Sequence, residues 1–592
     1  MKYDFFKKIL VFLLFTSFVL SASFAQTVKL KIIETSDVHG AILPYDMVND
    51  TTSNSSLAQI QSYLNFERSL PNQEVVLLDN GDILQGDPFV YYYNFVDTTS
   101  PHMDAIAMNL MRYDAATVGN HDIETGHKVY DRFRKQIMFP WLAANAIDTK
   151  TGKPYFKPYT VIERKGIKIA VLGMITPGIP KWLPKQIWEG IEFEDMIVTA
   201  KKWVPIIKEK EKPDLLIGLF HSGVDYTYDG ETAKTYKNEN ASKLVAEQVP
   251  GFDIVFVGHD HHGWNFKVAN PEGDSVLVIG PLARARDFSV AAIEMNYDSL
   301  KNKWEAKSIS GENIKTSQFR PESHFMSTFA LNLNIVGNYV AKPIGVIKKT
   351  ISTRESLFGP SRFVDLIHTF QLEKTGADIS FVSPLSFDAQ IDSGWIRVRD
   401  MFKLYRYENF LYTMRLTGKE IKNYLEFSYA NWFNQMKSAD DHLLKFKKDD
   451  DGNLIYSERS GSPQLVQRYY NFSSAAGINY IVDVSKPANE KVNIISLSNR
   501  KPFYEDSIYT VAINSYRGNG GGGHLTRGAG IPKDELSNRV ISSTDKDLRF
   551  YMMKWIEKKK SIYPQLIENW KVVPEKWWKA GKEKDYKILF GK

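Results

Sequence analysis

The chain has 592 residues, of which 43% are hydrophobic and 24% charged. This length suffices for two or three domains, and the composition is typical of a folded globular protein rather than a mostly disordered one. The formal net charge is only +6, which does not indicate binding of a nucleic-acid polymer through a basic surface. Cysteine is absent, so disulfides and thiolate ligands are excluded and a metal site must use His, Asp, Glu or Asn.

Residues 1–25 have the layout of a secretory signal peptide. Lysines in the first eight residues precede an apolar run over Ile9–Leu20, and small residues stand at Ser23 and Ala25. A membrane anchor is the alternative, but about 20 apolar residues are needed to cross a bilayer. We therefore expect cleavage after Ala25 and a mature chain that is periplasmic or secreted and has no membrane span.

Between Val28 and about Pro281 one pattern recurs, in which a short apolar run ends in a cluster of Asp, Asn, His and Gly. The runs are Leu30–Thr35, Val75–Leu78, Ala115–Val118, Leu215–Phe220 and Ile254–Val257. Continuous apolar runs are typical of buried parallel strands, and an intervening segment such as Leu57–Phe66 is helix-like. This alternation predicts an α/β domain whose polar clusters meet at the carboxyl edge of a sheet, where such domains place their active sites.

The rest of the chain has a different organisation. Ser317–Tyr339 contains few Gly or Pro residues and predicts a helical connector, and a second region of helices and strands follows it. That region ends with the strand-rich segment Gly477–Ser515 and a glycine loop over Gly518–Gly523. We divide the chain into a signal peptide (1–25), an N-terminal domain (26–315), a connecting helix (316–345), a C-terminal domain (346–550) and a helical tail (551–592).

Histidines gather in the strand-end clusters of the first domain. Six of the twelve lie there, namely His39, His121, His221, His259, His261 and His262. Asp37 and His39 stand two residues apart, so an extended backbone directs both side chains to one side, and the same holds for His259 and His261. Imidazole, carboxylate and amide groups suit divalent cations such as Zn, Mn, Fe or Co. Such a cluster can hold two metals about 3.5–4 Å apart that share one carboxylate.

The clusters also form an ordered set of motifs. They read Asp37-Val-His39, Gly81-Asp82, Gly119-Asn120-His121-Asp122, His221 and Gly258-His259-Asp260-His261. Together they resemble the complete motif set of the calcineurin-like metallophosphoesterases. Their order and spacing are similar to those of the secreted 5'-nucleotidase family, which includes bacterial 2',3'-cyclic-nucleotide 2'-phosphodiesterase/3'-nucleotidases. The resemblance implies a four-layer α/β/β/α metallophosphoesterase domain that a helix joins to an α+β substrate-binding domain.

The resemblance also implies a role for each motif residue. Asp37, His39, Asp82 and His261 would hold one cation, and Asp82, Asn120, His221 and His259 would hold the second. A metal-bound hydroxide would attack phosphorus, while His121 would face the phosphate and support the leaving oxygen. The family orients this histidine with an Asp, and Glu124 stands at that position here. A Ser-His-Asp hydrolase is disfavoured because the Gly-x-Ser-x-Gly motif is missing.

The C-terminal half extends the resemblance. Ser356–Pro360, Gly376–Ser380 and Leu404–Asn409, with Leu416–Glu426, are similar to the 5'-nucleotidase C-terminal domain. In the family this domain binds the nucleotide base between two aromatic rings, an arrangement that stacking favours. The candidates for this sandwich are Phe472 and Tyr516, with Arg517 and Asn519 as further substrate contacts. The glycines that follow Tyr516 allow the backbone to approach a ligand closely.

Two features bear on the substrate. The Asn-Ser-Tyr-Arg motif that ends at Arg517 is similar to the cyclic-phosphodiesterase/3'-nucleotidase branch. Many 5'-nucleotidases have an Arg-bearing stretch where this chain reads Ser383–Asp388, and an Arg there would bind phosphate bidentately. We therefore expect a monomeric, exported enzyme that hydrolyses 2',3'-cyclic nucleotides and 3'-nucleotides. The alternatives are a 5'-nucleotidase or UDP-sugar hydrolase, a relative acting on a non-nucleotide anion, and a non-catalytic surface binding protein.

Overall fold

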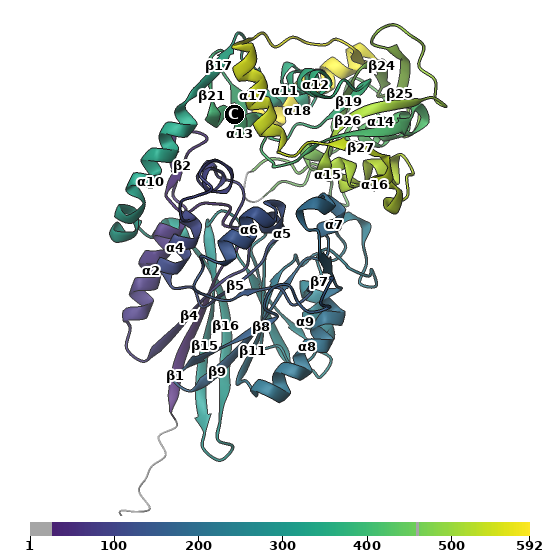
Figure 1. The fold of residues 1–592 in the computed structure, drawn as a ribbon. Helices are drawn as coiled ribbons and strands as arrows, with labels where there is room; N and C mark the ends of the chain where they lie inside the picture. Colours follow the sequence, from purple (N-terminus) through teal and green to yellow (C-terminus); the bar gives the residue numbers. More distant parts are fainter. Residues whose placement is uncertain (1–25, 458–460, 592) are drawn as a thin grey trace, which may run out of the picture.

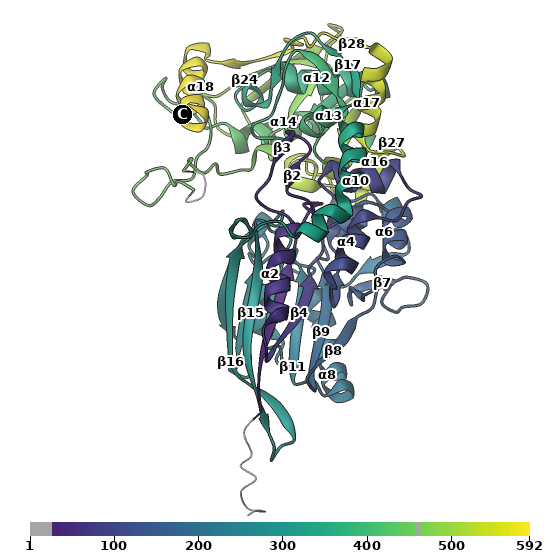
Figure 2. The same cartoon turned by 90° about the vertical axis from the view of Figure 1, so that its left-hand side faces the viewer.

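The computed structural model describes residues 26–457 and 461–591, so the predicted signal peptide lies outside the described residues. The chain forms two domains stacked along one long axis (Figure 1). Helix α10 (Ser323–Ala341) runs along the side of the molecule from the N-terminal toward the C-terminal domain, as Figure 2 shows from a second direction. Among the described residues, no helix is both long and apolar enough to span a bilayer.

Within the described residues, the N-terminal domain is a sandwich of two six-stranded sheets. The first sheet has the order β16 (Lys303–Lys315), β15 (Asp287–Asp298), β1 (Thr27–Thr35), β4 (Gln73–Asp79), β5 (Ala115–Thr117) and β6 (Trp141–Leu142). The second has the order β13 (Trp264–Ala269), β14 (Ser275–Gly280), β12 (Ile254–Val257), β11 (Leu215–His221), β9 (Ile167–Ile175) and β8 (Tyr159–Arg164). The central strands are parallel, and their carboxyl ends point toward the C-terminal domain (Figure 1).

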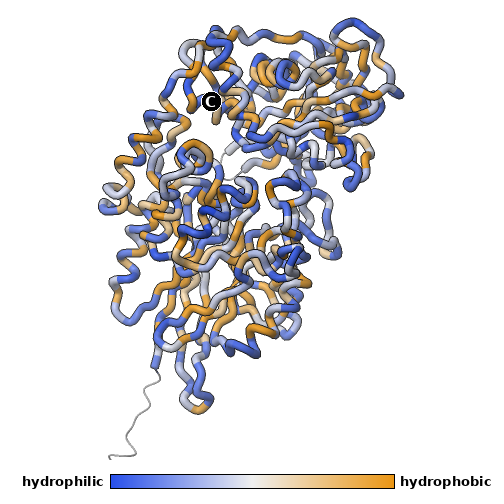
Figure 3. The backbone as a smooth tube through the Cα atoms, viewed as in Figure 1, coloured by the Kyte–Doolittle hydropathy of each residue, from blue (hydrophilic) through white to orange (hydrophobic). Residues whose placement is uncertain are grey.

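Hydrophobic clusters hold this sandwich together. Side chains of β1 alternate, so that Leu30 and Ile32 pack between the sheets while Ile33 packs beneath the outer helices. Each such buried side chain contributes about 1.5–3 kcal/mol. The first sheet is covered by α2 (Leu57–Ser69), α4 (Met103–Met111) and α6 (His127–Arg134), and the second by α8 (Met196–Glu211) and α9 (Ser242–Gln248). The predicted α/β/β/α layering is confirmed, and Figure 3 shows hydrophobic residues recurring along its strands.

The C-terminal domain is α+β, as predicted. Its largest sheet in the described part of the chain has the order β23 (Ser474–Ala476), β19 (Ile379–Val382), β26 (Ile508–Asn514), β22 (Leu411–Thr417) and β27 (Val540–Ser543). Helices α12 (Arg362–Thr375) and α14 (Gly418–Trp432) pack on this sheet. Two smaller sheets flank it. One has the order β21 (Gly394–Arg397), β17 (Pro343–Ile347) and β28 (Ser561–Ile562), and the other has the order β25 (Val492–Leu497), β24 (Ile478–Asp483) and β29 (Trp570–Val573).

The segment predicted as a helical tail, 551–592, is not purely helical. It includes most of α17 (Leu548–Lys559) and all of α18 (Glu575–Phe590), but β28 and β29 lie between these helices. β28 pairs in parallel with β17 and β29 pairs in parallel with β24, so the tail completes both flanking sheets. Trp570 and Val572 are buried in the core of the domain. Burial against strands far away in sequence therefore overrides the local preference of this segment.

Candidate metal centre and active site

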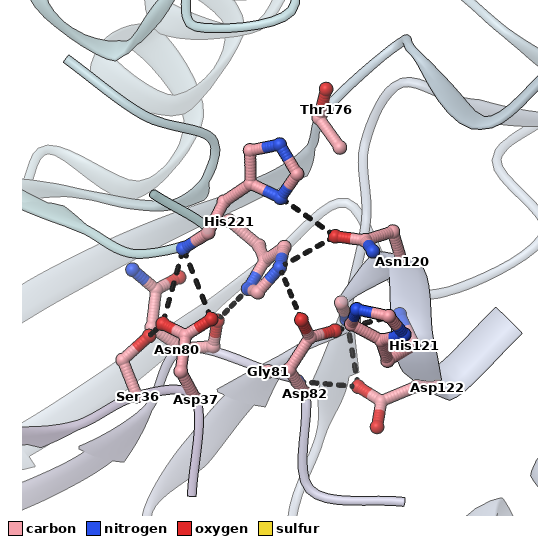
Figure 4. A network of polar contacts seen from close by, with 12 residues as sticks. Ser36, Asp37, Asn80, Gly81, Asp82, Asn120, His121, Asp122, Thr176 and His221 are labelled. Atoms are coloured by element: carbon pink, nitrogen blue, oxygen red, sulfur yellow. Dashed lines mark hydrogen bonds and ion pairs between the residues drawn. The ribbon is translucent and has the colours of Figure 1, made fainter. Parts of the chain in front are cut away.

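The carboxyl ends of the parallel strands bring the predicted ligands together. Asp37 and His39 follow β1, Asp82 follows β4, and His221 is the last residue of β11. Asn120 opens α5 (Asn120–Glu124) just after β5, and His259 and His261 follow β12. In Figure 4 the side chains of Asp82, Asn120 and His221 point toward one another. Residues up to 224 positions apart thus meet at the end of the sandwich that faces the C-terminal domain.

Asp37, His39, Asp82 and His261 form the first predicted set. One ligand atom from each lies within 4.8 Å of the others, an arrangement that could hold a metal ion. Nε2 of His39 is 3.1 Å from Nε2 of His261, and the latter atom is 3.3 Å from Oδ1 of Asp37. Three of these residues are buried, and His261 is partly exposed. The candidate site is therefore open on the His261 side.

Asp82, Asn120, His221 and His259 form the second predicted set. Nε2 of His221 is 3.2 Å from Oδ2 of Asp82 and 3.1 Å from Oδ1 of Asn120. The same Asn120 oxygen is 2.8 Å from Nδ1 of His259. Asp82 belongs to both sets, so the structure brings together all seven residues that the sequence pattern selects.

The protonation of His39 and Asp82 suits a cation. Nδ1 of His39 lies 3.0 Å from the Gln85 carbonyl and donates to it, which leaves the Nε2 lone pair directed into the site. Burial and the neighbouring His261 lower the pKa of His39 to about 3, so the ring is neutral. Despite burial, His221 holds the pKa of Asp82 well below its ordinary value. Oδ2 of this ionised carboxylate is buried, and its one polar neighbour given within the described residues is Nε2 of His221 at 3.2 Å, another predicted ligand atom, which fits two groups that would share a metal.

The backbone at the ligands is strained. Asp37, His39, Asp82, His259 and His261 have φ angles of 50°, 49°, 59°, 76° and 61°. Such left-handed conformations are uncommon for non-glycine residues and cost on the order of 1–3 kcal/mol each. Surrounding contacts hold them in place, since Asp37 N donates to Gly81 O at 3.0 Å and His39 N donates to Asp82 O at 2.9 Å. Strain concentrated at these positions is typical of a functional site.

Asp122 is a supporting residue that the motif reading leaves without a role. Its carboxylate accepts hydrogen bonds from the backbone N–H groups of Asp82 at 3.0 Å, Leu84 at 2.9 Å and Gly119 at 2.7 Å. It thereby fixes the loop that carries Asp82 against the loop that carries Asn120. Gly119 permits this approach, because a Cβ there would lie 2.1 Å from Oδ1 of Asp82.

His121 and Glu124 form a hydrogen-bonded pair on α5. Nδ1 of His121 lies 2.5 Å from Oε2 of Glu124, so the longer side chain reaches the histidine across one helical turn. Burial lowers the pKa of His121, but the carboxylates of Asp82 and Glu124 outweigh it and raise the pKa to about 9. At neutral pH the ring is therefore an imidazolium, able to stabilise negative charge or to donate a proton.

The structure separates the predicted base-binding residues. Tyr516, in α15 (Ser515–Gly518), is partly exposed, and α15 contacts α7 (Ile179–Trp182) of the N-terminal domain. Arg517 is only 2% exposed, and its guanidinium donates to the backbone oxygens of Tyr470 at 2.7 Å and Gly521 at 2.8 Å. Asn519 donates from Nδ2 to the backbone oxygen of Trp182, 3.1 Å away in the N-terminal domain. These two residues shape the glycine loop and the domain interface.

Phe472 does not lie in an open slot. It is 2% exposed and packs in the C-terminal core, with its ring centroid 5.4 Å from that of Trp432 and nearly parallel to it. Tyr470, two residues earlier, is partly exposed and lies near Tyr516, which sequence reasoning missed. Tyr228 of the N-terminal domain faces both tyrosines, and burial raises its pKa. Tyr228 of the N-terminal domain and the two tyrosines of the C-terminal domain therefore form an aromatic group where the domains meet.

Comparisons with known proteins agree with this architecture. Residues 30–263 match the family model for the calcineurin-like phosphoesterases, and residues 343–527 match that for the 5'-nucleotidase C-terminal domain. The chain therefore contains a calcineurin-like phosphoesterase domain. Its second domain makes it a member of the 5'-nucleotidase family, in agreement with the resemblance of its motifs.

Similar proteins include enzymes with several nucleotide activities. The 2',3'-cyclic-nucleotide 2'-phosphodiesterase/3'-nucleotidase of Yersinia enterocolitica is 26% identical, over 93% of this chain and 89% of that protein. The trifunctional nucleotide phosphoesterase YfkN of Bacillus subtilis is also 26% identical over 93% of this chain, which spans only 39% of that longer protein. A Staphylococcus aureus structure assigned as a 5'-nucleotidase superposes with a TM-score of 0.73 at 19% identity, over 92% of this chain and 99% of that one. At this identity the superposition shows the fold alone.

Proposed function

We propose that the chain is an exported, dinuclear metal-dependent phosphoesterase that hydrolyses 2',3'-cyclic nucleotides and 3'-nucleotides to nucleoside and phosphate. The convergence of two candidate metal sets on Asp82, beside the His121–Glu124 pair, carries this proposal. A non-catalytic binding protein would tolerate gaps in such a set, whereas all seven candidate ligands are present. The metals are Zn, Mn, Fe or Co, because imidazole, carboxylate and amide ligands suit these ions.

The residues of the site divide the chemistry among them. A pair of divalent cations, when bound, supplies Lewis-acid charge for the phosphoryl oxygens and activates water for in-line attack. Asp82 belongs to both candidate sets and would hold both cations, and Asp122 keeps its loop in position. Glu124 holds Nδ1 of His121, so the opposite ring nitrogen donates its proton to the departing ester oxygen. No covalent enzyme intermediate is required.

Several observations favour a nucleotide substrate. Tyr516 and Tyr470 offer partly exposed rings, and Glu239, whose charge acts on Tyr516, lies 3.1 Å from Nε2 of His259. Base–aromatic stacking accepts any nucleobase. Ser383–Asp388 contains no arginine to bind a phosphate bidentately, which favours a 3' or cyclic phosphate over a 5' phosphate. The Yersinia relative, which carries both activities in its name, is matched over nearly the whole chain. The competing proposal is a 5'-nucleotidase or UDP-sugar hydrolase on the same scaffold.

The remaining parts of the proposal concern the mature protein. We propose export after cleavage near Ala25, a metallophosphoesterase domain at 26–315 and a nucleotide-binding domain at 346–550. A monomer suffices, because one chain supplies both the candidate metal ligands and the aromatic residues. The substrate is a small-molecule nucleotide rather than a nucleic-acid polymer, in keeping with the low net charge.

A substrate panel tests the function. Purified protein loaded with Mn or Zn is assayed on 2',3'-cyclic AMP, 3'-AMP, 5'-AMP, UDP-glucose and bis-p-nitrophenyl phosphate, with and without chelator. We expect the first two to turn over fastest and chelator to abolish activity. Asp82→Ala should lower both bound metal and rate, whereas Asp450→Ala, on an exposed loop, should change neither. Preference for 5'-AMP would support the competing proposal, and inactivity on every phosphoester would refute both.

A further inference from the structure

Glu408 is a buried carboxyl group without a hydrogen bond. It lies in the loop between α13 (Val398–Leu404) and β22 and is 5% exposed. Neither of its oxygens has a hydrogen-bond partner among the described residues. The guanidinium of Arg549 approaches it only to 3.7 Å, and the approaching Nη1 is also without a partner in this part of the chain. Because buried polar groups are nearly always paired, these atoms are available to a partner that the described residues do not supply.

The loop that carries Glu408 rests on the catalytic side of the N-terminal domain. Phe410, two residues further on, packs against the core cluster that contains Ile123, which lies between His121 and Glu124 in α5. The charges of Glu124 and His121 both act on Glu408, together with those of Arg549 and Asp547. Glu408 therefore lies on the side of the C-terminal domain that is turned toward the catalytic pair.

The chemistry of this position matches a hydroxyl group. Burial raises the pKa of Glu408 to about 8, so at neutral pH the carboxyl offers an O–H donor and free acceptor oxygens. A substrate hydroxyl complements both, because it also donates and accepts. Under the proposed function, His121 marks the place of the departing ester oxygen. In a 3'-nucleotide the carbon next to that oxygen carries the 2'-hydroxyl, whereas a 5'-nucleotide has no hydroxyl on the neighbouring carbon.

We propose that Glu408 is a specificity-determining residue that hydrogen-bonds the ribose hydroxyl next to the departing oxygen. The interaction selects 3'-ribonucleotides over their 2'-deoxy analogues, because a deoxy substrate leaves the buried carboxyl unpaired. When a 2',3'-cyclic nucleotide opens to a 3'-nucleotide, O2' is the departing oxygen and takes its proton from His121, so the contact with Glu408 belongs to the second step, the hydrolysis of the 3'-nucleotide. This inference rests on the proposed function and adds the recognition of the sugar to it.

The test compares sugars at a fixed base. Metal-loaded wild-type protein is assayed on 3'-AMP, 2'-deoxy-3'-AMP and 2'-deoxy-2'-fluoro-3'-AMP. We expect kcat/KM for 3'-AMP to exceed that for either analogue by about 10- to 100-fold, since carbon-bound fluorine is a poor hydrogen-bonding partner. In Glu408→Leu, kcat/KM for 3'-AMP should differ from that for either analogue by no more than about threefold. Glu408→Gln keeps a hydrogen-bond donor and an acceptor and should retain most of the wild-type preference for 3'-AMP. Glu373→Leu, an exposed site in the same domain, is the matched control.

The outcomes separate the two proposals. A wild-type ratio near one, full activity on the fluoro analogue, or an unchanged ratio in folded Glu408→Leu would each overturn the role of Glu408. The first two measurements use only wild-type protein, so they test the role of Glu408 even if the leucine variant fails to fold. Hydrolysis of phosphoesters without sugar discrimination overturns this inference alone. Inactivity of the wild type on all phosphoesters overturns the proposed function and this inference with it.

Discussion

At the scale of single residues, His121 shows how the site divides binding from proton transfer. It lies next to Asn120 in sequence, yet its ring pairs with Glu124 instead of joining either ligand set. An imidazolium at this place matters most when the leaving group is a poor one, because an alkoxide needs a proton and a nitrophenolate does not.

We predict that His121→Asn lowers kcat on 3'-AMP by about 10²–10⁴-fold and lowers the rate on bis-p-nitrophenyl phosphate far less. Steady-state kinetics on both substrates, with metal content measured in parallel, check this. Glu124→Gln should give a smaller change in the same direction, because it weakens the charge that holds the imidazolium. Equal losses on both substrates would contradict a role in protonating the leaving group.

A second pair of residues separates stacking from packing. Tyr470 is partly exposed beside Tyr516, whereas Phe472 is buried against Trp432. We predict that Tyr470→Ala raises KM for nucleotides by roughly 5- to 100-fold, since a base–aromatic stack contributes about 1–3 kcal/mol, and leaves the melting temperature nearly unchanged. Phe472→Ala should instead destabilise the fold by about 3–5 kcal/mol. Kinetics and urea unfolding of both variants distinguish the roles, and a reversed pattern would restore the sandwich predicted from sequence.

At the scale of elements, the sequence predicted the strands that carry the site but not every detail around it. Buried parallel strands read as continuous apolar runs, so β1, β4, β5, β11 and β12 were predictable together with the polar residues that follow them. The strands β28 and β29 were not, because they form only by pairing with residues far away in sequence. The choice between Tyr470 and Phe472 also needed the structure, since the spacing of aromatic residues does not reveal which ring faces the core. The positive φ angles of the ligands leave no compositional signal at all.

His368 tests how helix α12 is joined to its sheet. The ring is 1% exposed and bridges Ser380 in β19 and Ser474 in β23, with nitrogen–oxygen distances of 3.0 and 3.2 Å. Burial lowers its pKa to about 3 in the folded state, whereas an unfolded histidine titrates near about 6.5. Below about pH 6.5 His368 binds a proton in the unfolded chain but not in the folded chain. The free energy of unfolding therefore falls by up to about 1.4 kcal/mol for each pH unit of acidification.

We predict that His368→Gln, which cannot titrate, makes the free energy of unfolding less dependent on pH between about 6.5 and 4 than it is in wild type. Urea unfolding across this range measures the slope. His324→Gln, at an exposed position of α10, is the control and should keep the wild-type slope. Parallel slopes for wild type and His368→Gln would show that the buried histidine does not contribute to acid sensitivity.

At the scale of the whole molecule, the catalytic residues lie beneath a second domain that scattered contacts join to the first, among them the Arg399–Asp50 ion pair and the hydrogen bond from the Tyr91 hydroxyl to Asp547. Arg527 of the C-terminal domain pairs with Asp229 of the N-terminal domain at 2.5 Å, and both side chains are 49% exposed. An ion pair this exposed contributes roughly 0–1 kcal/mol, and Asn519 adds one hydrogen bond to Trp182. A substrate bound between Tyr516 and the metal centre must pass this interface, so we expect the domains to separate during turnover.

The absence of native cysteine allows a direct test of that separation. Asp229→Cys and Arg527→Cys, combined in one chain, can be joined by a bifunctional maleimide whose spacer contains a disulfide. We predict that cross-linking lowers nucleotide turnover by about tenfold or more and that cleavage of the spacer with reductant restores it, because substrate and product can then pass again. Each single-cysteine variant, treated with the same reagent, controls for modification itself and should keep its activity. Full turnover by the cross-linked enzyme would contradict the need for the domains to separate. Catalysis would then proceed with the domains arranged as in this structure.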